Sequence, residues 1–122
     1  MLITGSQNIV SIVLLISMLF VPLHIFAFTL QIEPYDGTYL LSQTGTAIRT
    51  HIPSTGFWSE TTYYGLPPPS FNQYFSDYEM PVGAYFTVCA YYLTTYEQIG
   101  CEDYYRSGYI GGSASIDLSP YG

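Results

Sequence analysis

The stretch from Tyr85 to Tyr105, YFTVCAYYLTTYEQIGCEDYY, predicts a β-hairpin. Aromatic and β-branched residues, which favour strands, fill both arms, and the turn falls near Thr94-Thr95. If Cys89 faces Cys101 directly, alternation places on the cysteine face Tyr85, Thr87, Tyr91, Ile99, Asp103 and Tyr105. The opposite face then carries Phe86, Val88, Ala90, Tyr92, Gln98, Glu102 and Tyr104.

The chain has two cysteines, and both lie in this hairpin. In an oxidising compartment they have one intramolecular pairing, so we expect a disulfide between Cys89 and Cys101. Closing a loop of this length stabilises a small domain by about 3 kcal/mol. The alternative is two reduced, buried thiols that act as small hydrophobic residues.

Other segments extend the β pattern outward from the hairpin. Phe28 to Glu33 alternates strictly, and Ser113 to Leu118 alternates with Ala114, Ile116 and Leu118 inward. Tyr39 to Ser42 and Ala47 to Ile52 flank Gln43-Thr44-Gly45, a turn signal that predicts a second hairpin.

The remaining segment, Pro53 to Pro81, shows no regular pattern, and its triple proline, Pro67 to Pro69, predicts a loop or an edge strand. No helix is expected after the N-terminal segment. We therefore predict an all-β fold, a small antiparallel β-sandwich of about five to seven strands that forms a single domain over residues 28–122.

Residues 1–32 contain no Asp, Glu, Lys or Arg, and Ile9 to Phe28 is one apolar run. Pro22 ends a hydrophobic stretch of signal-peptide length, and Ala27 suits the last position before cleavage. Residues 1–27 are therefore predicted to be a signal peptide that forms a hydrophobic helix. An uncleaved N-terminal anchor and a buried core helix of a cytosolic protein are the alternatives. Both export readings place the rest of the chain in the secreted space or on the extracellular face of the cell surface.

The formal net charge is −7, with 9 acidic residues against Arg49 and Arg106 and with no Lys. This charge makes nucleic acid and anionic lipid poor partners, so a membrane contact is expected only through an uncleaved N-terminal segment. Lys on edge strands is a common guard against sheet-to-sheet pairing. Its absence predicts self-association through edge strands as one mode of partner binding.

The motif Pro81-Val82-Gly83-Ala84-Tyr85, before Phe86 to Val88, resembles the Pro-x-Gly-x-Tyr motif that leads into a late strand of prealbumin-like and immunoglobulin-like exported modules. Ser113 to Leu118 resembles their closing strand. The resemblance is confined to the C-terminal part of the chain and implies a β-sandwich only. Members of that group that build an intramolecular isopeptide bond need a Lys, so this chemistry is excluded here. The close spacing of Cys89 and Cys101 predicts a clamp within a hairpin, unlike the inter-sheet bridge of antibody-type domains.

Few residues point to catalysis or to metal binding. His51 shares a strand face with Arg49, but no local motif supplies a nucleophile and an orienting group, so a surface histidine is the simpler interpretation. Four carboxylates could bind a hard cation such as Ca²⁺ if they converged: Asp77, Glu79, Glu102 and Asp103. The alternative is a solvated acidic rim. No cofactor is expected.

The aromatic stretch between residues 57 and 78 is the best candidate for recognition. Exposed Tyr and Trp offer flat apolar faces with a polar tip, which suit a sugar ring or another protein. The candidate ligand-binding residues are Trp58, Tyr63, Tyr64, Tyr74 and Tyr78. The alternative is that these rings fill a core short of Leu and Ile.

Three functions follow from these patterns, in order of preference. The first is a non-catalytic secreted or cell-surface module that acts through protein contacts or self-assembly. The second is a carbohydrate-binding module that uses exposed Trp and Tyr. The third is a small secreted hydrolase.

Overall fold

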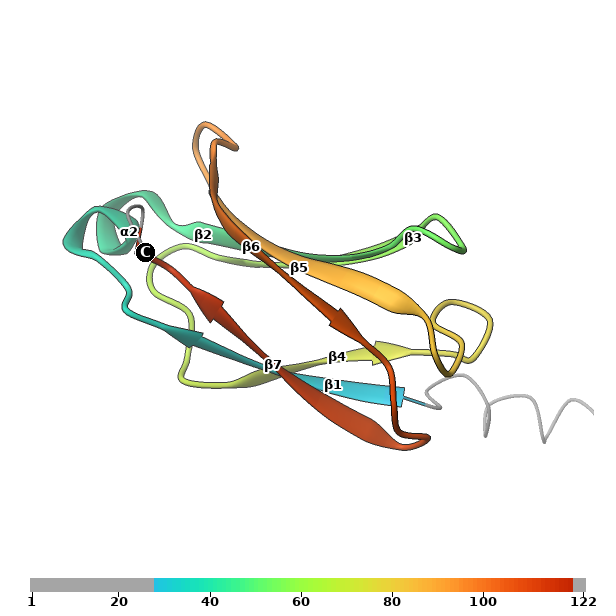
Figure 1. The fold of residues 1–122 in the computed structure, drawn as a ribbon. Coiled ribbons are helices and arrows are strands. Elements are labelled where there is room, and N and C mark those ends of the chain that lie inside the picture. The colour runs from blue at the N-terminus through green and yellow to red at the C-terminus, as the bar shows by residue number, and fades with distance from the viewer. Residues whose placement is uncertain (1–27, 120–122) are drawn as a thin grey trace, which may run out of the picture.

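The computed structural model describes residues 28–119. They form two packed layers of β-strands with one short helix at one end (Figure 1). In chain order the elements are β1 (Phe28–Tyr35), α2 (Tyr39–Thr44), β2 (Thr46–Ile52), β3 (Phe57–Tyr63), β4 (Phe71–Phe75), β5 (Tyr85–Tyr92), β6 (Gln98–Tyr105) and β7 (Gly111–Asp117). The prediction of an all-β, sandwich-like fold is confirmed.

One sheet has the strand order β4-β1-β7 and the other has the order β3-β2-β5-β6. Every pair is antiparallel except β1 and β7, which run parallel from Thr29 beside Gly111 to Tyr35 beside Asp117. The expectation of a purely antiparallel sandwich is therefore wrong. After β6 the chain crosses to the other sheet and arrives beside the first residues of β1, where the Thr29 amide donates to the Ile110 carbonyl (2.9 Å). From this point β7 runs in the same direction as β1.

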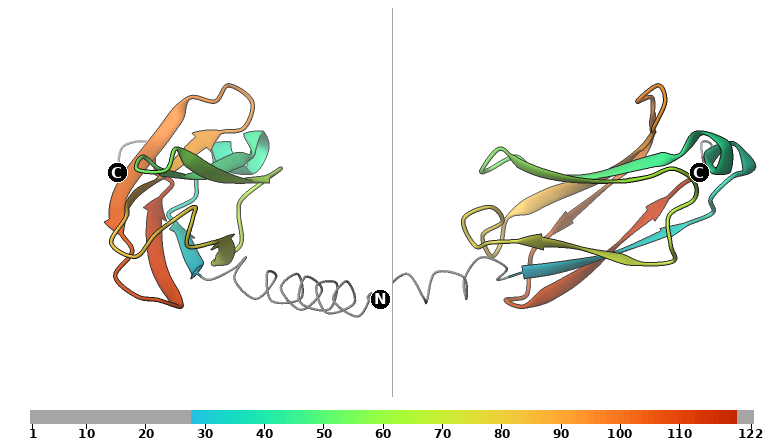
Figure 2. Two further views of the ribbon diagram at one scale, coloured as in Figure 1. Left: turned by 90° about the vertical axis from the view of Figure 1, so that its right-hand side faces the viewer. Right: turned by 180° about the vertical axis from the view of Figure 1, so that it is seen from behind.

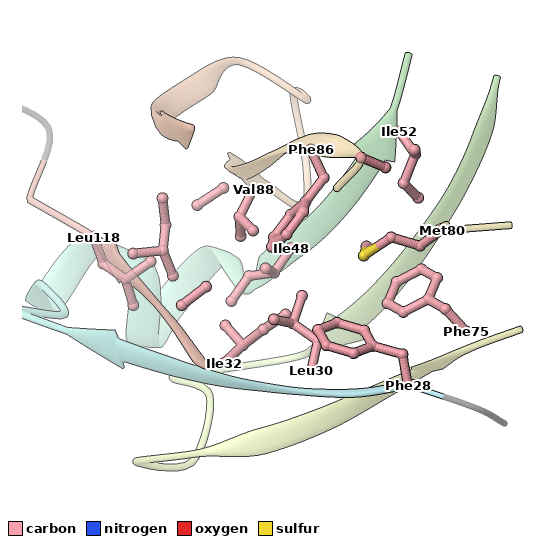
Figure 3. Close-up of a cluster of buried hydrophobic side chains, with 14 of the residues drawn as sticks. Phe28, Leu30, Ile32, Ile48, Ile52, Phe75, Met80, Phe86, Val88 and Leu118 are labelled. Carbon is pink, nitrogen blue, oxygen red and sulfur yellow. The ribbon is translucent and has the colours of Figure 1, made fainter. Parts of the chain in front are cut away.

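The core lies between the two sheets and is built from the inward residues of each strand (Figure 3). Leu30 and Ile32 from β1 meet Ile48 from β2 and Val88 from β5, and all four are fully buried. Ala114, Ile116 and Leu118 are buried as the alternation predicted. One polar pair interrupts this core: Thr50 donates to Gln73 Oε1 (2.5 Å), and Gln73 donates to the Ile48 carbonyl (3.3 Å). The buried amide is thus hydrogen-bonded, as a buried polar group must be.

The predicted strand Tyr39 to Ser42 is wrong, because these residues belong to helix α2. Thr38 caps the helix by accepting from the Leu41 amide (3.3 Å), and only Leu41 is buried. Gly45 ends the helix with a φ of 83°, and its amide donates to the Leu41 carbonyl. The predicted turn residue Gly45 thus closes a helix rather than a hairpin.

The segment from Pro53 to Pro81, which shows no pattern in the sequence, contains strands β3 and β4. Their inward positions alternate, but several are polar: Ser59 and Thr61 in β3, and Gln73 in β4. Hydrophobic alternation is therefore hidden in both strands. The triple proline, Pro67 to Pro69, lies in the loop between them, as predicted.

The register of the β5-β6 hairpin is confirmed, with Cys89 opposite Cys101. A β-bulge follows at Ala90 and Tyr91, where the pairing passes from Gly100 directly to Gln98. Ile99, predicted on the cysteine face, packs instead against the core. The reason is the extra residue, which locally breaks the strict alternation of a strand.

The predicted signal peptide, residues 1–27, lies outside the described residues. Among residues 28–119, no helix is long and apolar enough to cross a membrane. The loop between β5 and β6 rises away from the three-stranded sheet in all views (Figure 2). It therefore borders the outer face of the four-stranded sheet.

Candidate functional site

The outer face of the four-stranded sheet carries two cross-strand rows of side chains that point away from the core. The first row is Trp58, His51, Thr87 and Asp103, and the second is Glu60, Arg49, Cys89 and Cys101. Tyr85 and Tyr105 pair beside the first row, and Tyr91 lies beside the second. We refer to this surface, from Trp58 on β3 to Tyr105 on β6, as the outer face.

Arg49 is at the centre of one end of the outer face. Its guanidinium carbon lies 4.5 Å from the centre of the Trp58 ring and 5.6 Å from that of Tyr91. Its Nε and Nη2 donate to Glu60 Oε1 at 3.1 and 3.0 Å. A cation enclosed by two aromatic rings and a carboxylate is a favourable arrangement even at a partly exposed position.

Tyr96 completes this group from the projecting loop between β5 and β6. Its hydroxyl donates to Glu60 Oε2 (2.7 Å), and its ring lies 6.0 Å from that of Tyr91. The hydrogen bond to Glu60 raises the pKa of Tyr96 above its ordinary value of 10.0, because it stabilises the protonated phenol. Glu60 therefore ties the loop to the sheet.

The predicted disulfide is present, with Cys89 and Cys101 12 residues apart on adjacent strands. It lies in the same row as Arg49 and Glu60, so it clamps β6 to the strands that carry the aromatic group. Such a covalent bond is in keeping with an extracellular location.

Tyr85 and Tyr105 form an aromatic pair at the other end of the outer face. Their ring centres are 5.8 Å apart, and the two residues are 72% and 58% exposed. Asp103 lies two residues before Tyr105 on the same face and accepts a hydrogen bond from Thr87 (2.8 Å). This end therefore presents two exposed rings beside a carboxylate that Thr87 hydrogen-bonds.

The five candidate ligand-binding residues do not converge. Trp58 is 52% exposed on the outer face, whereas Tyr74 lies on the opposite side of the molecule, on the outer side of β4. Tyr64 and Tyr78 are exposed in the loops that follow β3 and β4. Tyr63 packs its ring edge-on against Phe71 (5.3 Å between centres), and partial burial raises its pKa.

The four candidate metal-binding carboxylates do not converge either. Asp77 accepts from Arg106 (2.7 Å), and Glu79 accepts from the Ser76 amide (2.8 Å). Glu102 and Asp103 are consecutive on β6 and so point to opposite sides of the sheet. Within the described part of the chain, no three His, Cys, Asp or Glu side chains group in a way that could hold a metal ion.

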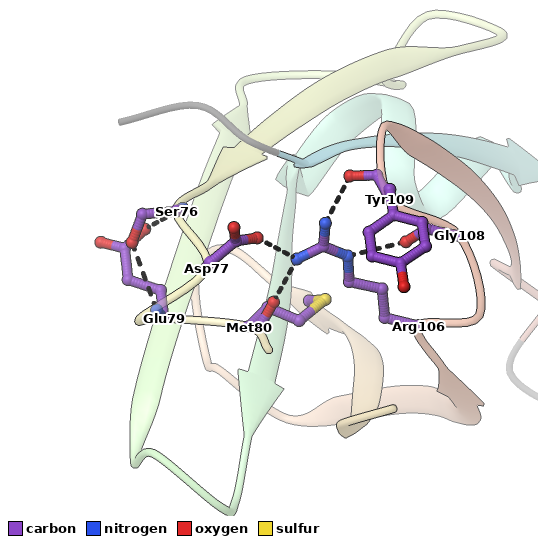
Figure 4. A network of polar contacts seen from close by, with 7 residues as sticks. All are labelled: Ser76, Asp77, Glu79, Met80, Arg106, Gly108 and Tyr109. Atoms are coloured by element: carbon purple, nitrogen blue, oxygen red, sulfur yellow. Dashed lines mark hydrogen bonds and ion pairs between the residues drawn. The ribbon is translucent and has the colours of Figure 1, made fainter. Parts of the chain in front are cut away.

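Arg106 carries the densest polar network of the described residues, and sequence reasoning missed it. It is 1% exposed, yet it donates to Asp77 and to the carbonyls of Met80, Gly108 and Tyr109 (Figure 4). Its guanidinium carbon also lies 4.6 Å from the centre of the Phe28 ring. Arg106 thus joins the loop after β4 to the loop before β7. A single Arg in a loop gives no sequence signal for such a role, beyond being one of only two cations.

A cleft of about 300 Å³ lies between β6 and β7, next to Tyr105. Its apolar lining comes from Phe28, Leu30 and Phe86, and much of the rest is contributed by Gly108 and Gly111 to Ser113. Its volume lies at the small end of the range for ligand sites. The Arg106 guanidinium is already hydrogen-bonded within the protein, so it is not available to bind a ligand in the cleft. The outer face is therefore the stronger candidate.

No protein-family model, curated protein or solved structure matches this chain.

Proposed function

We propose that this chain is a non-catalytic secreted or cell-surface module that acts through protein contacts made by the outer face. The observation that carries the proposal is the gathering of aromatic rings on one side of one sheet. Trp58, Tyr85 and Tyr105 are exposed there, Tyr91 is half-buried beside them, and Tyr96 joins them from the loop between β5 and β6. Aromatic residues and Arg are enriched where proteins bind one another, because they bury a large area and keep a polar group at the tip.

Side-chain contacts and a disulfide hold the residues of this surface in place, which suits recognition. Arg49 is fixed between Trp58 and Glu60, and the disulfide fixes β6 against β5. Rings held in place before binding lose less side-chain entropy when a partner covers them. The outer face therefore needs little rearrangement to accept another protein.

Self-assembly through edge strands is a second form of the same proposal. The sheets end in four edge strands, β3, β4, β6 and β7, and no Lys protects them. However, two copies with a net charge of −7 repel each other. This repulsion favours a different protein as the partner.

A carbohydrate-binding module is the alternative candidate, and Trp58 supports it. The ring is half exposed, and His51 lies opposite it on β2, where an imidazole could bond to a sugar hydroxyl. Arg49 already covers part of the indole, which limits the area left for a sugar ring. This competition makes carbohydrate the second choice.

The hydrolase predicted from the sequence has no support from the geometry of His51. His51 pairs in register with Trp58 and Thr87, and among residues 28–119 its side chain makes no hydrogen bond. A general base needs a nucleophile within hydrogen-bond reach and a group that orients it. The hydrolase stays a prediction from the sequence and is not proposed.

Two solution measurements on the full chain separate these candidates. Analytical ultracentrifugation reports self-assembly, and fluorescence of Trp58, the single Trp, reports ligands on the outer face. A partner-binding module stays monomeric over a wide concentration range and shows no fluorescence change with a panel of polysaccharides. Saturable quenching by one polysaccharide, lost in Trp58→Ala, would instead establish the carbohydrate candidate.

A further inference from the structure

The two ends of the outer face have the same kind of construction, but only one of them contains a cation. At one end, Trp58, Tyr91 and Glu60 surround the Arg49 guanidinium. At the other end, Tyr85 and Tyr105 form a ring pair beside Asp103. Rings with a neighbouring carboxylate attract a cation through both the ring quadrupole and the full charge.

The chain has no Lys or Arg side chain to place at the second end, where the row that holds Asp103 also holds His51. Its sequence contains two Arg and no Lys. Arg49 is held by Glu60 on β3, and Arg106 is buried with Asp77 and three carbonyl groups. A Lys or Arg side chain that occupies this arrangement must therefore come from outside the chain.

The position of Asp103 supports binding rather than simple solvation. The Thr87 hydroxyl donates to one carboxylate oxygen, Oδ1 (2.8 Å), which restricts the orientation of the carboxylate. Asp103 and Tyr105 are two residues apart on one strand face, about 7 Å along the strand, which is within reach of one long side chain. The two rings and the carboxylate can thus contact the same Lys or Arg.

We propose that Tyr85, Tyr105 and Asp103 bind a Lys or Arg side chain from a basic segment of a partner protein. The proposal rests on the proposed function and names the chemistry of its partner. The net charge of −7 attracts such a segment and speeds its association. A second copy of this chain is a poor partner at this site, because both of its Arg side chains are already engaged.

Binding of a short Lys- and Arg-rich peptide to the full chain tests the proposal, with the same peptide acetylated on its Lys and citrullinated in place of Arg as the uncharged control. The peptide is expected to bind, and its uncharged form is not. Asp103→Asn and the double variant Tyr85→Ser/Tyr105→Ser should each weaken binding about tenfold, a loss of about 1.4 kcal/mol. Thr87→Val, which frees Asp103, should give a smaller loss.

Matched controls separate this site from general attraction to an acidic protein. Glu33→Gln removes one exposed charge from β1 on the other sheet, and Tyr39→Ser removes one exposed ring from α2. Both should leave binding unchanged, with circular dichroism confirming that every variant is folded. Equal losses in Asp103→Asn and Glu33→Gln, or no binding by the basic peptide, would overturn the proposal.

Failure here and failure of the proposed function give different results. If the outer face still cross-links to another protein in the producing cell while the basic peptide does not bind, the partner is a protein of other chemistry and only this inference fails. If the outer face neither binds the peptide nor cross-links to a protein, both fail.

Discussion

The guanidinium of Arg49 lies over the indole of Trp58, with 4.5 Å between its central carbon and the ring centre, while Nε and Nη2 both donate to Glu60. These three side chains come from neighbouring strands, β2 and β3, and no turn or loop is needed to bring them together. The contact fixes the orientation of the single Trp on the outer face. It therefore links the stability of the sheet to the surface proposed for recognition.

Replacing Arg49 should loosen this end of the outer face. Arg49→Met removes the cation from the ring and leaves Glu60 without its ion pair, so we expect a loss of about 1 kcal/mol in the free energy of unfolding. The emission of Trp58 should shift to longer wavelength as water reaches the ring. Denaturant titration and fluorescence measure both effects. Arg49→Lys is the control and should lie in between, because Lys keeps the charge but loses the two-nitrogen contact; an Arg49→Met protein as stable as the parent would contradict the account.

Reducing the disulfide should destabilise the domain without changing the register between β5 and β6. The Cys89–Cys101 bond closes a loop between residues 12 positions apart, and a loop of that size corresponds to about 3 kcal/mol. Thermal unfolding with and without reductant should show the loss, and the double variant Cys89→Ala/Cys101→Ala should match the reduced protein. A melting temperature that does not respond to reductant would show that the bond adds nothing to stability.

Substitutions of Arg106 and of its partner Asp77 should differ strongly in how much they lower the free energy of unfolding. Arg106→Met leaves the carbonyls of Met80, Gly108 and Tyr109 without their buried donor, so we expect a loss of about 3 kcal/mol or more. Asp77→Asn should cost less than about 1 kcal/mol, because the Asp77 side chain is 64% exposed. Chemical unfolding of the two variants gives the comparison. Equal losses would mean that the ion pair, and not the carbonyl contacts, makes Arg106 important.

Tyr96 should make stability depend on pH in the alkaline range. Its pKa is raised in the folded protein, first by the hydrogen bond to Glu60, so the folded state holds the phenol proton more tightly than the unfolded state. The contribution is fully present below the ordinary pKa of 10.0 and is lost as the pH rises through the folded value. Unfolding free energies measured from about pH 9 to about pH 11 should fall less steeply in Tyr96→Phe than in the parent. Identical pH profiles of the parent and Tyr96→Phe would show that the hydrogen bond to Glu60 does not contribute to stability.

Much of the fold could be predicted where alternation and covalent chemistry agree. The β5-β6 hairpin is an example, because Cys89 opposite Cys101 allows only one register. The closing strand was equally clear from Ala114, Ile116 and Leu118. Strands β3 and β4 could not be found in this way, because Thr61 and Gln73 occupy inward positions and are satisfied only by hydrogen bonds that form across the fold.

The short helix and the outer face show a different limit. A six-residue helix such as α2 has too few turns for a helical pattern, and its Thr38 cap resembles an ordinary loop residue. The outer face extends from Trp58 on β3 to Tyr105 on β6. Which residues share it therefore depends on the order of the strands in the sheet, which the sequence does not show. The sequence identified Trp58 as a candidate but grouped it with Tyr74, which the sandwich places on the other side.

Photo-cross-linking from two faces of the full chain tests the central claim, that the outer face contacts another protein. A photoreactive phenylalanine replaces Tyr85 on the outer face in one variant and Tyr74 on the outer side of β4 in another. After irradiation of the producing cells and their medium, position 85 should give a discrete protein adduct, which Asp103→Asn should reduce, and position 74 should give none. Adducts at position 74 alone, or none at position 85, would contradict the account.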